Sequence, residues 1–380
     1  MTELYHGREQ TQAKHLILKR YLEPFAHKIL SNPAWPSIDF IDGFSGPWEN
    51  VDTENLSDTS IGVALTTLSK VASQKGHTQN RRRIRCIFNE SNPASFERLS
   101  AYAKRAEKDF PLIEVLTFKG KFENNAAQIR AHCTNSFHLL FVDPTGYTGF
   151  PPSSLQHFRG RSSEIIVNFM RSFIERFVSG NHEDNVKALV GLVGTERAEN
   201  VLSAGLTIEL LEREYLAMLK DDLGYKFAAL SPIHNPDKNE IHFDLMYCTN
   251  HYEGLETMRK AEEGALSQHD RNRFKKSIEA KGGDLFGGIF GDMDILGPYQ
   301  KVRKQHLAEC RSFVLNLISL SQRPLRFSEV AALTQQDLFL KRSEIGSVVV
   351  QLANEGLVVP TWKKRNGRKP NGDDPIVKQA

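Results

Sequence analysis

Two aspartates that end apolar segments are the residues of this 380-residue chain best placed to do chemistry. Asp42 follows the segment 37–41 and opens the turn Asp-Gly-Phe-Ser-Gly-Pro, and Asp143 follows the segment 138–142 and opens Asp-Pro-Thr-Gly-Tyr. Each segment is typical of a buried parallel strand, and α/β folds bind ligands at the carboxyl edge of such strands. With Glu90, which ends a third apolar segment, they predict a site for a nucleotide-type cofactor.

The chain around these acids alternates between strand and helix patterns. An amphipathic helix at 11–30 comes first. Strands are then predicted at 37–41, 84–90, 113–118, 138–142 and 164–169, and helices at 61–74, 94–109, 124–133 and 153–158. The helix at 94–109 has clear start signals, because Asn92 can cap it and Pro93 occupies its first position. This alternation predicts an α/β fold with a Rossmann-like, doubly wound and mostly parallel sheet.

Two further segments complete the predicted first domain, which we place at residues 1–280. The segments 226–233 and 241–249 are predicted to pair as a late antiparallel hairpin, which is the expected end of a class I methyltransferase domain. The stretch at about 173–223 is predicted to be helical, and its part from 185 onward carries no nucleophile or ligand cluster. We expect it to be a helical insertion over the open edge of the sheet.

The pattern changes after a Gly-rich, aperiodic segment at 281–299, which we expect to be a linker. Helices at 300–320, 328–333 and 341–354, a short extended piece at 326–327, a strand from 357 and a basic hairpin tip follow, with a return strand near 374–378. This order predicts a C-terminal winged helix-turn-helix domain at 300–380. Such domains bind DNA or RNA and also dock proteins. The residues expected to contact nucleic acid are Lys341, Arg342, Lys363, Lys364, Arg365 and Arg368.

The composition argues against several classes of protein. Hydrophobic residues make up 40% and charged residues 25% of the chain, which is typical of soluble globular proteins. No apolar run approaches the ~20 residues that span a bilayer, and the first ten residues lack the apolar core of a signal peptide. The four cysteines lie far apart without metal-binding spacing, so we expect no metal site and a reducing, cytoplasmic location. A net charge of +3 does not by itself indicate nucleic-acid binding.

With these motifs in view, the chain resembles the three-Cys-motif partner protein (TcmP) family over roughly residues 10–265. The resemblance rests on Lys14-His15, Tyr21-Leu22, the turn at 42–47, Asn89-Glu90, the motif at 141–146, and the segment 247–251 with Gly254 and Met258. It implies a relative of the class I S-adenosylmethionine (SAM) methyltransferases. The order of motifs is similar to that of nucleic-acid methyltransferases that carry Asp-Pro-Pro-Tyr.

The resemblance also implies roles for the motif after the fourth strand. In Asp-Pro-Pro-Tyr enzymes the acid and a backbone carbonyl accept hydrogen bonds from the target amine, and the aromatic ring stacks on the flipped base. Asp143, Pro144 and Tyr147 are therefore the expected catalytic residues. A structural alternative stays open for Asp143, whose side chain would then serve only to cap the next turn. His138, at the start of the same strand, is expected to be a core or edge histidine.

SAM is the expected cofactor. The glycine turn would let backbone N–H groups approach it, Glu90 would bind the ribose diol, and Phe122 would cover the adenine. The structural alternatives are an ordinary strand-to-loop turn for the glycine segment, a solvated acid at a helix N-terminus for Glu90, and core packing for Phe122. For Lys14 and His15 we expect one of two positions, either on the wall of the pocket or on a solvated face of the first helix. The predicted cofactor-binding residues are Asp42, Gly43, Phe44, Gly46, Glu90, Phe122 and Glu123.

These observations favour a SAM-dependent methyltransferase acting on nucleic acid. Two departures favour an alternative. Trp48 stands where the methyltransferase turn usually ends in glycine, and Thr145-Gly146 replaces Pro-Tyr. The alternative is a non-catalytic partner of a three-Cys-motif protein, and a third interpretation is a winged-helix regulator that binds nucleic acid.

Overall fold

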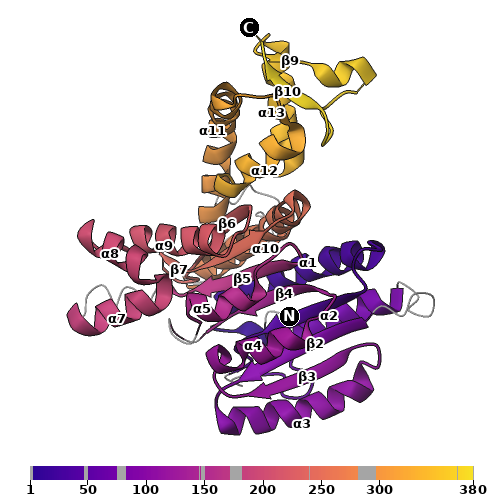
Figure 1. Ribbon diagram of the computed structural model, residues 1–380, viewed down its shortest axis with the longest axis vertical. Helices are drawn as coiled ribbons and strands as arrows, with labels where there is room; N and C mark the ends of the chain where they lie inside the picture. The colour runs from indigo at the N-terminus through magenta and orange to yellow at the C-terminus, as the bar shows by residue number, and fades with distance from the viewer. Residues whose placement is uncertain are drawn as a thin grey trace. The chain divides into compact units, whose positions relative to one another are not determined.

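The structure is a computed structural model that describes residues 3–46, 50–74, 83–144, 146, 150–171, 182–238, 240–280, 297–365 and 367–379 (Figure 1). Its contacts divide the chain into two compact units, Met1–Asn250 and His251–Ala380. The first domain predicted from the sequence extends to residue 280, whereas the contacts assign helix α10 (Tyr252–Ala280) to the second unit. Most of the expected linker, residues 281–296, lies outside the described residues.

One seven-stranded sheet organises the first unit, in the order β3-β2-β1-β4-β5-β7-β6. Neighbours among β1 to β5 pair in parallel, and β7 runs antiparallel to β5 and β6. The predicted mostly parallel sheet and late hairpin are therefore confirmed. The strands are β1 (Ser37–Asp42), β2 (Arg83–Glu90), β3 (Glu114–Lys119), β4 (Phe137–Val142), β5 (Ser163–Phe169), β6 (Phe227–His234) and β7 (Ile241–Thr249).

Helices cover both faces of this sheet, as a doubly wound fold requires (Figure 1). One face carries α1 (Glu9–Ser31), α2 (Ser60–Gln74) and α3 (Pro93–Asp109), and the other carries α4 (Phe122–His132) and α5 (Pro152–Leu155). Short 3₁₀ turns lie at η1 (Glu3–Tyr5) and η2 (Gln156–Phe158). The predicted start of α3 is confirmed, because the Asn92 side chain accepts the Ser95 N–H.

The described part of the predicted helical insertion comprises α7 (His182–Val193), α8 (Thr195–Ser203), α9 (Ile208–Ala217) and a π-helical turn, η3 (Met218–Asp222). Its apolar side chains, among them Leu189, Val201 and Tyr215, join one core cluster with Phe169 of β5 and Met246 of β7. These helices therefore bury the α4–α5 face of the sheet at its β5–β7 side.

The second unit contains, after α10, a three-stranded antiparallel sheet in the order β8-β10-β9 and three helices. The order of elements predicted beyond residue 300 is confirmed. Trp362 is fully buried in the shared core of this unit. The elements are α11 (Pro298–Leu320), β8 (Leu325–Arg326), α12 (Phe327–Asp337), α13 (Arg342–Asn354), β9 (Val358–Val359), η4 (Thr361–Arg365) and β10 (Pro375–Lys378).

Among the described helices of both units, none combines the length and the apolar character that crossing a bilayer requires.

Candidate functional site

The larger of two adjoining cavities measures about 510 Å³ and lies at the carboxyl ends of β1, β2 and β3. Six of the seven predicted cofactor-binding residues line it: Gly43, Phe44, Gly46, Glu90, Phe122 and Glu123. The remaining wall is formed by Asn89, Ser91, Asn92, Ser95, Lys121, Pro144 and Gly146. The structure therefore brings together segments that lie up to about 100 residues apart in the sequence, from Gly43 to Gly146, at the edge where such sheets bind ligands.

Glu90 is fixed on the wall of this cavity. Its Oε1 atom accepts the Asn92 N–H at 2.6 Å, and its backbone oxygen accepts the Gly120 N–H at 2.9 Å. A β-carbon at position 46 would lie 1.9 Å from Oε2 of Glu90. Only glycine therefore allows the turn after β1 to approach this carboxylate so closely.

Asn89 connects the loops that form the cavity, although the sequence analysis gave it no site role. Its side-chain nitrogen donates to the backbone oxygens of Gly43 and Gly120, each at 3.1 Å. Its side-chain oxygen accepts a hydrogen bond from Asn125 at 2.8 Å, and its backbone oxygen accepts the Ser45 N–H at 2.8 Å. This single buried amide ties the ends of β1, β2 and β3 to the start of α4.

Asp42, the seventh predicted cofactor residue, lines neither cavity. Its carboxylate is fully buried and accepts hydrogen bonds from the Ser60 hydroxyl at 2.6 Å and the Phe44 N–H at 3.0 Å. Burial raises the pKa of Asp42 to about 6, against the opposing effect of these two hydrogen bonds. Asp42 thus shapes the turn and anchors it to the start of α2.

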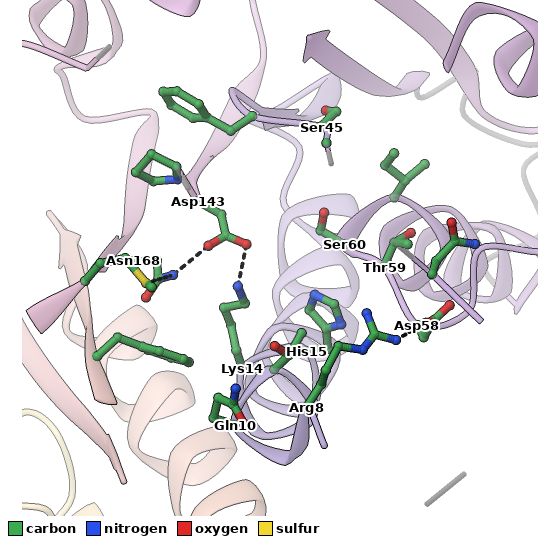
Figure 2. A pocket seen from close by; sticks show the side chains of 18 of the residues that line it. Arg8, Gln10, Lys14, His15, Ser45, Asp58, Thr59, Ser60, Asp143 and Asn168 are labelled. Atoms are coloured by element: carbon green, nitrogen blue, oxygen red, sulfur yellow. Dashed lines mark hydrogen bonds and ion pairs between the residues drawn. The ribbon is translucent and has the colours of Figure 1, made fainter. Parts of the chain in front are cut away.

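The smaller cavity, of about 210 Å³, is built around Asp143. Figure 2 shows the Asp143 carboxylate between two side chains, Lys14 from α1 and Asn168 from β5. Lys14 Nζ lies 2.5 Å from Oδ2, and Asn168 Nδ2 lies 2.6 Å from Oδ1. Phe44, Gly46 and Pro144 line both cavities. The predicted catalytic residues Asp143 and Pro144 therefore adjoin the predicted cofactor residues.

Helix α1 supplies much of the wall of the smaller cavity. Lys14 and His15 are buried and line it, so the cavity-lining alternative is correct for both. Lys14 Nζ also lies 5.5 Å from the centre of the Phe243 ring. Burial and the neighbouring Lys14 charge lower the pKa of His15 to about 3, so its ring is neutral near pH 7, and Nδ1 lies 3.0 Å from the Tyr5 hydroxyl. Arg8 forms an ion pair with Asp58 on the same wall.

Tyr147 and the two positions Trp48 and Thr145 lie outside the described residues. His138 is a core residue, as expected, with Nε2 3.3 Å from the Phe158 backbone oxygen. Among the described residues, no group of three or more His, Cys, Asp or Glu side chains is arranged to hold a metal ion.

The predicted nucleic-acid contacts of the second unit fall into two groups. Lys341 and Arg342 contact acids of α10, with Lys341 Nζ 3.1 Å from Glu263 and Arg342 3.4 Å from Glu256. Lys363 and Arg368, which belong to the connection between β9 and β10, are exposed. The side chains of Lys364 and Arg365 lie outside the described set.

Comparison with known proteins adds little to this description. No family model and no curated protein matches the sequence. Among solved structures, the chain is similar to the crystal structure of spermidine synthase from Thermotoga maritima, at 11% identity and a TM-score of 0.29. The match covers 63% of this chain and 62% of that protein. A similarity this small carries no information about activity.

Proposed function

We propose that this chain is a SAM-binding, methyltransferase-like protein that acts on nucleic acid. The observation that carries the proposal is the convergence of six predicted cofactor residues on one cavity at the edge of the sheet. The strand order supports it, since the order changes direction between β1 and β4 and only β7 is reversed, as in class I methyltransferase domains.

The residues of the larger cavity fit an adenosine. A carboxylate is an acceptor for the two hydroxyl donors of a ribose, and Glu90 holds one oxygen toward Asn92 and the other toward the Gly46 turn. Phe44 and Phe122, whose ring centres are 5.7 Å apart, supply an apolar wall for the base. Glu90 would therefore hold the ribose, and the two phenylalanines would hold the adenine.

The smaller cavity fits the acceptor side. SAM, when bound, supplies an electrophilic methyl group carried on a sulfonium. Pro144 lines both cavities and Asp143 lines the smaller one, so the two residues would orient an acceptor beside the cofactor, together with Tyr147. Alignment is the main requirement of such a transfer, because a well-placed nucleophile needs little acid–base assistance.

The second unit would add affinity for nucleic acid. Its order of helices and its small antiparallel sheet favour a winged helix, whose wing would be the connection between β9 and β10. We assign phosphate contacts to the exposed Lys363 and Arg368, with Lys364 and Arg365 beside them in sequence. Lys341 and Arg342 are weaker candidates, since acids of α10 already neutralise them.

Two alternatives share this fold. Trp48 and Thr145-Gly146 depart from methyltransferase motifs, which favours a TcmP family member that acts as the non-catalytic partner of a three-Cys-motif protein. The second unit alone would suit a regulator that binds nucleic acid. Both alternatives predict no methyl transfer by the isolated chain.

Calorimetric titration with SAM tests the proposal. We expect micromolar binding by the wild type and by Glu97→Ala, an exposed glutamate of α3 outside both cavities. Glu90→Ala should bind at least about tenfold more weakly, since a charged hydrogen-bonding partner of the ribose is lost. Asp143→Ala should bind SAM but transfer no methyl group to DNA or RNA. Duplex binding without SAM binding would favour the regulator, and loss of both would favour the partner protein.

A further inference from the structure

Asn168 occupies the position next to Asp143 at the end of the neighbouring strand. Val142 of β4 pairs with Val167 of β5, so the residues that follow them, Asp143 just past β4 and Asn168 near the end of β5, lie side by side on adjacent parallel strands. Asn168 Nδ2 donates to Asp143 Oδ1 at 2.6 Å. This hydrogen bond sets the orientation of the Asn168 amide, because its nitrogen and not its oxygen must face the carboxylate.

The side-chain oxygen of Asn168 is left as an acceptor. The residue is 2% exposed, and this oxygen has no hydrogen-bond partner among the described residues. A buried carbonyl oxygen without a partner is unfavourable, and native proteins rarely keep one without a reason. Asn168 also lines the smaller cavity, so a ligand there is a natural partner for it.

Other groups on the wall of this cavity have the same character. The side-chain oxygens of Gln10 and Asn50 are likewise buried and unpaired within the described part of the chain. The nearby cations already have acids beside them, since Lys14 contacts Asp143 and Arg8 contacts Asp58. Three buried side-chain oxygens on this wall therefore lack a donor among the described residues, and a ligand group that donates hydrogen bonds would complement them.

We propose that Asn168 is a specificity-determining residue, whose side-chain oxygen and the Asp143 carboxylate together accept the two N–H bonds of a primary amino group on a nucleobase. This inference rests on the proposed function, because it identifies the acceptor of the same site. An amino group that is held through both N–H bonds keeps one face of its nitrogen free for an incoming methyl group. In its place a carbonyl group would offer no hydrogen-bond donor, and a hydroxyl group would offer only one.

Binding of matched oligonucleotides to the full chain tests this assignment without SAM. The probes are single strands with one central adenine or cytosine and the same strands with hypoxanthine or uracil, in which a carbonyl replaces the amino group. We expect the wild type to prefer the amino base by about tenfold in at least one pair, since the wrong base leaves buried acceptors unpaired. Asn168→Leu should abolish this preference while binding of the deaminated strand changes less than about twofold.

Two further variants separate recognition from folding. Asn168→Ser keeps a small polar side chain but removes the carbonyl oxygen, so it should also lose the preference. Asn200→Ala changes an exposed asparagine of α8 outside both cavities and should behave as the wild type. Equal binding of both strands by the wild type, or an unchanged preference in both Asn168 variants, would overturn the assignment.

The proposed function is tested separately by methyl transfer from labelled SAM, followed by mass spectrometry of the product. A preference for the amino base without transfer supports the role of Asn168 and counts against a methyltransferase. Transfer to a ring carbon or an oxygen supports a methyltransferase and overturns the role of Asn168.

Discussion

Gly46 and Glu90 meet at the wall of the larger cavity, where a β-carbon on the glycine would lie 1.9 Å from the Oε2 atom of the glutamate. No side chain fits there unless the carboxylate moves. Since Oε1 of Glu90 accepts the Asn92 N–H, such a movement would also disturb the start of α3. The turn after β1 and the acid that ends β2 therefore form one structural unit.

Replacing Gly46 by alanine should weaken SAM binding strongly while lowering the stability of the fold only slightly. The Glu90 carboxylate, the far end of a flexible side chain, can rotate away, so we expect the melting temperature to fall by only a few degrees. The affinity for SAM should fall by about tenfold or more, because the ribose partner is displaced. Calorimetric titration and thermal denaturation measure the two effects. Gly191→Ala, where an added β-carbon meets no atom within 4 Å, is the matched control. Unchanged SAM affinity in Gly46→Ala would show that the position of the Glu90 carboxylate does not control SAM binding.

Asp42 should make the fold less stable as the pH rises from about 4 to about 6. Burial raises its pKa from 3.8 to about 6, so in this range the native state holds a proton that the unfolded chain releases. A difference of about two pKa units corresponds to about 3 kcal/mol. Urea denaturation between pH 4 and pH 7 should therefore show the stability of the wild type falling relative to Asp42→Asn, which cannot titrate.

Asp52 supplies a control of opposite sign for this experiment. Hydrogen bonds from Ser57 and Asn55 lower its pKa, so its contribution to stability is present above its unfolded pKa and is lost as the pH falls. The wild type should accordingly gain stability relative to Asp52→Asn as the pH rises. A pH-independent difference between the wild type and Asp42→Asn would show that Asp42 titrates normally.

The ion pair of Lys14 and Asp143 should show strong coupling in a double-mutant cycle. Their side chains are 9% and 18% exposed, so removing one partner leaves the other charge poorly solvated. Lys14→Met and Asp143→Asn should each destabilise the protein by about 1–3 kcal/mol, and the double variant by at least about 1 kcal/mol less than their sum. Urea denaturation of the four proteins gives the coupling free energy. Additive effects would mean that the pair contributes nothing beyond its separate residues.

Basic residues of the second unit should differ in their effect on nucleic-acid binding. The double variant Lys363→Ala/Arg368→Ala should weaken binding and reduce the slope of log K against log salt by about 2, because each phosphate contact contributes about 0.9. Lys341→Ala should change that slope little, since Glu263 already lies 3.1 Å from Lys341 Nζ. Fluorescence anisotropy at several salt concentrations measures both slopes. A larger change of slope in Lys341→Ala than in the double variant would indicate that nucleic acid binds at the start of α13 instead.

The ends of the strands could be predicted from the sequence, but the direction of each side chain could not. Glu90 and Asp143 end apolar segments and line the cavities, as predicted. Asp42 ends a segment of the same kind, yet it lies on the same face of β1 as Phe40, because side chains alternate along a strand, and it points to α2. Which helix covers that face is a property of the tertiary structure.

Polar side chains inside apolar patterns were the hardest part of the site to predict. Asn168 belongs to a strand buried along its whole length, and Lys14 lies in a helix whose pattern also allows a solvated face. A signal was present for Asn168, since it is polar and lies near the end of an apolar segment, as Asp143 does. The 29-residue helix α10 begins at Tyr252, just after the boundary at Asn250, and nothing in its sequence pattern assigns it to the second unit, so its membership depends on contacts alone.

The wall that Phe44, Gly46 and Pro144 share between the two cavities has a pharmacological consequence. A molecule that joins an adenosine-like group to an amino-bearing base by a short linker would reach both cavities at once. Once its first half is seated, the second half engages at a high effective concentration. Such a bivalent inhibitor should bind far more tightly than either half, and its best linker length would report the span across those three residues.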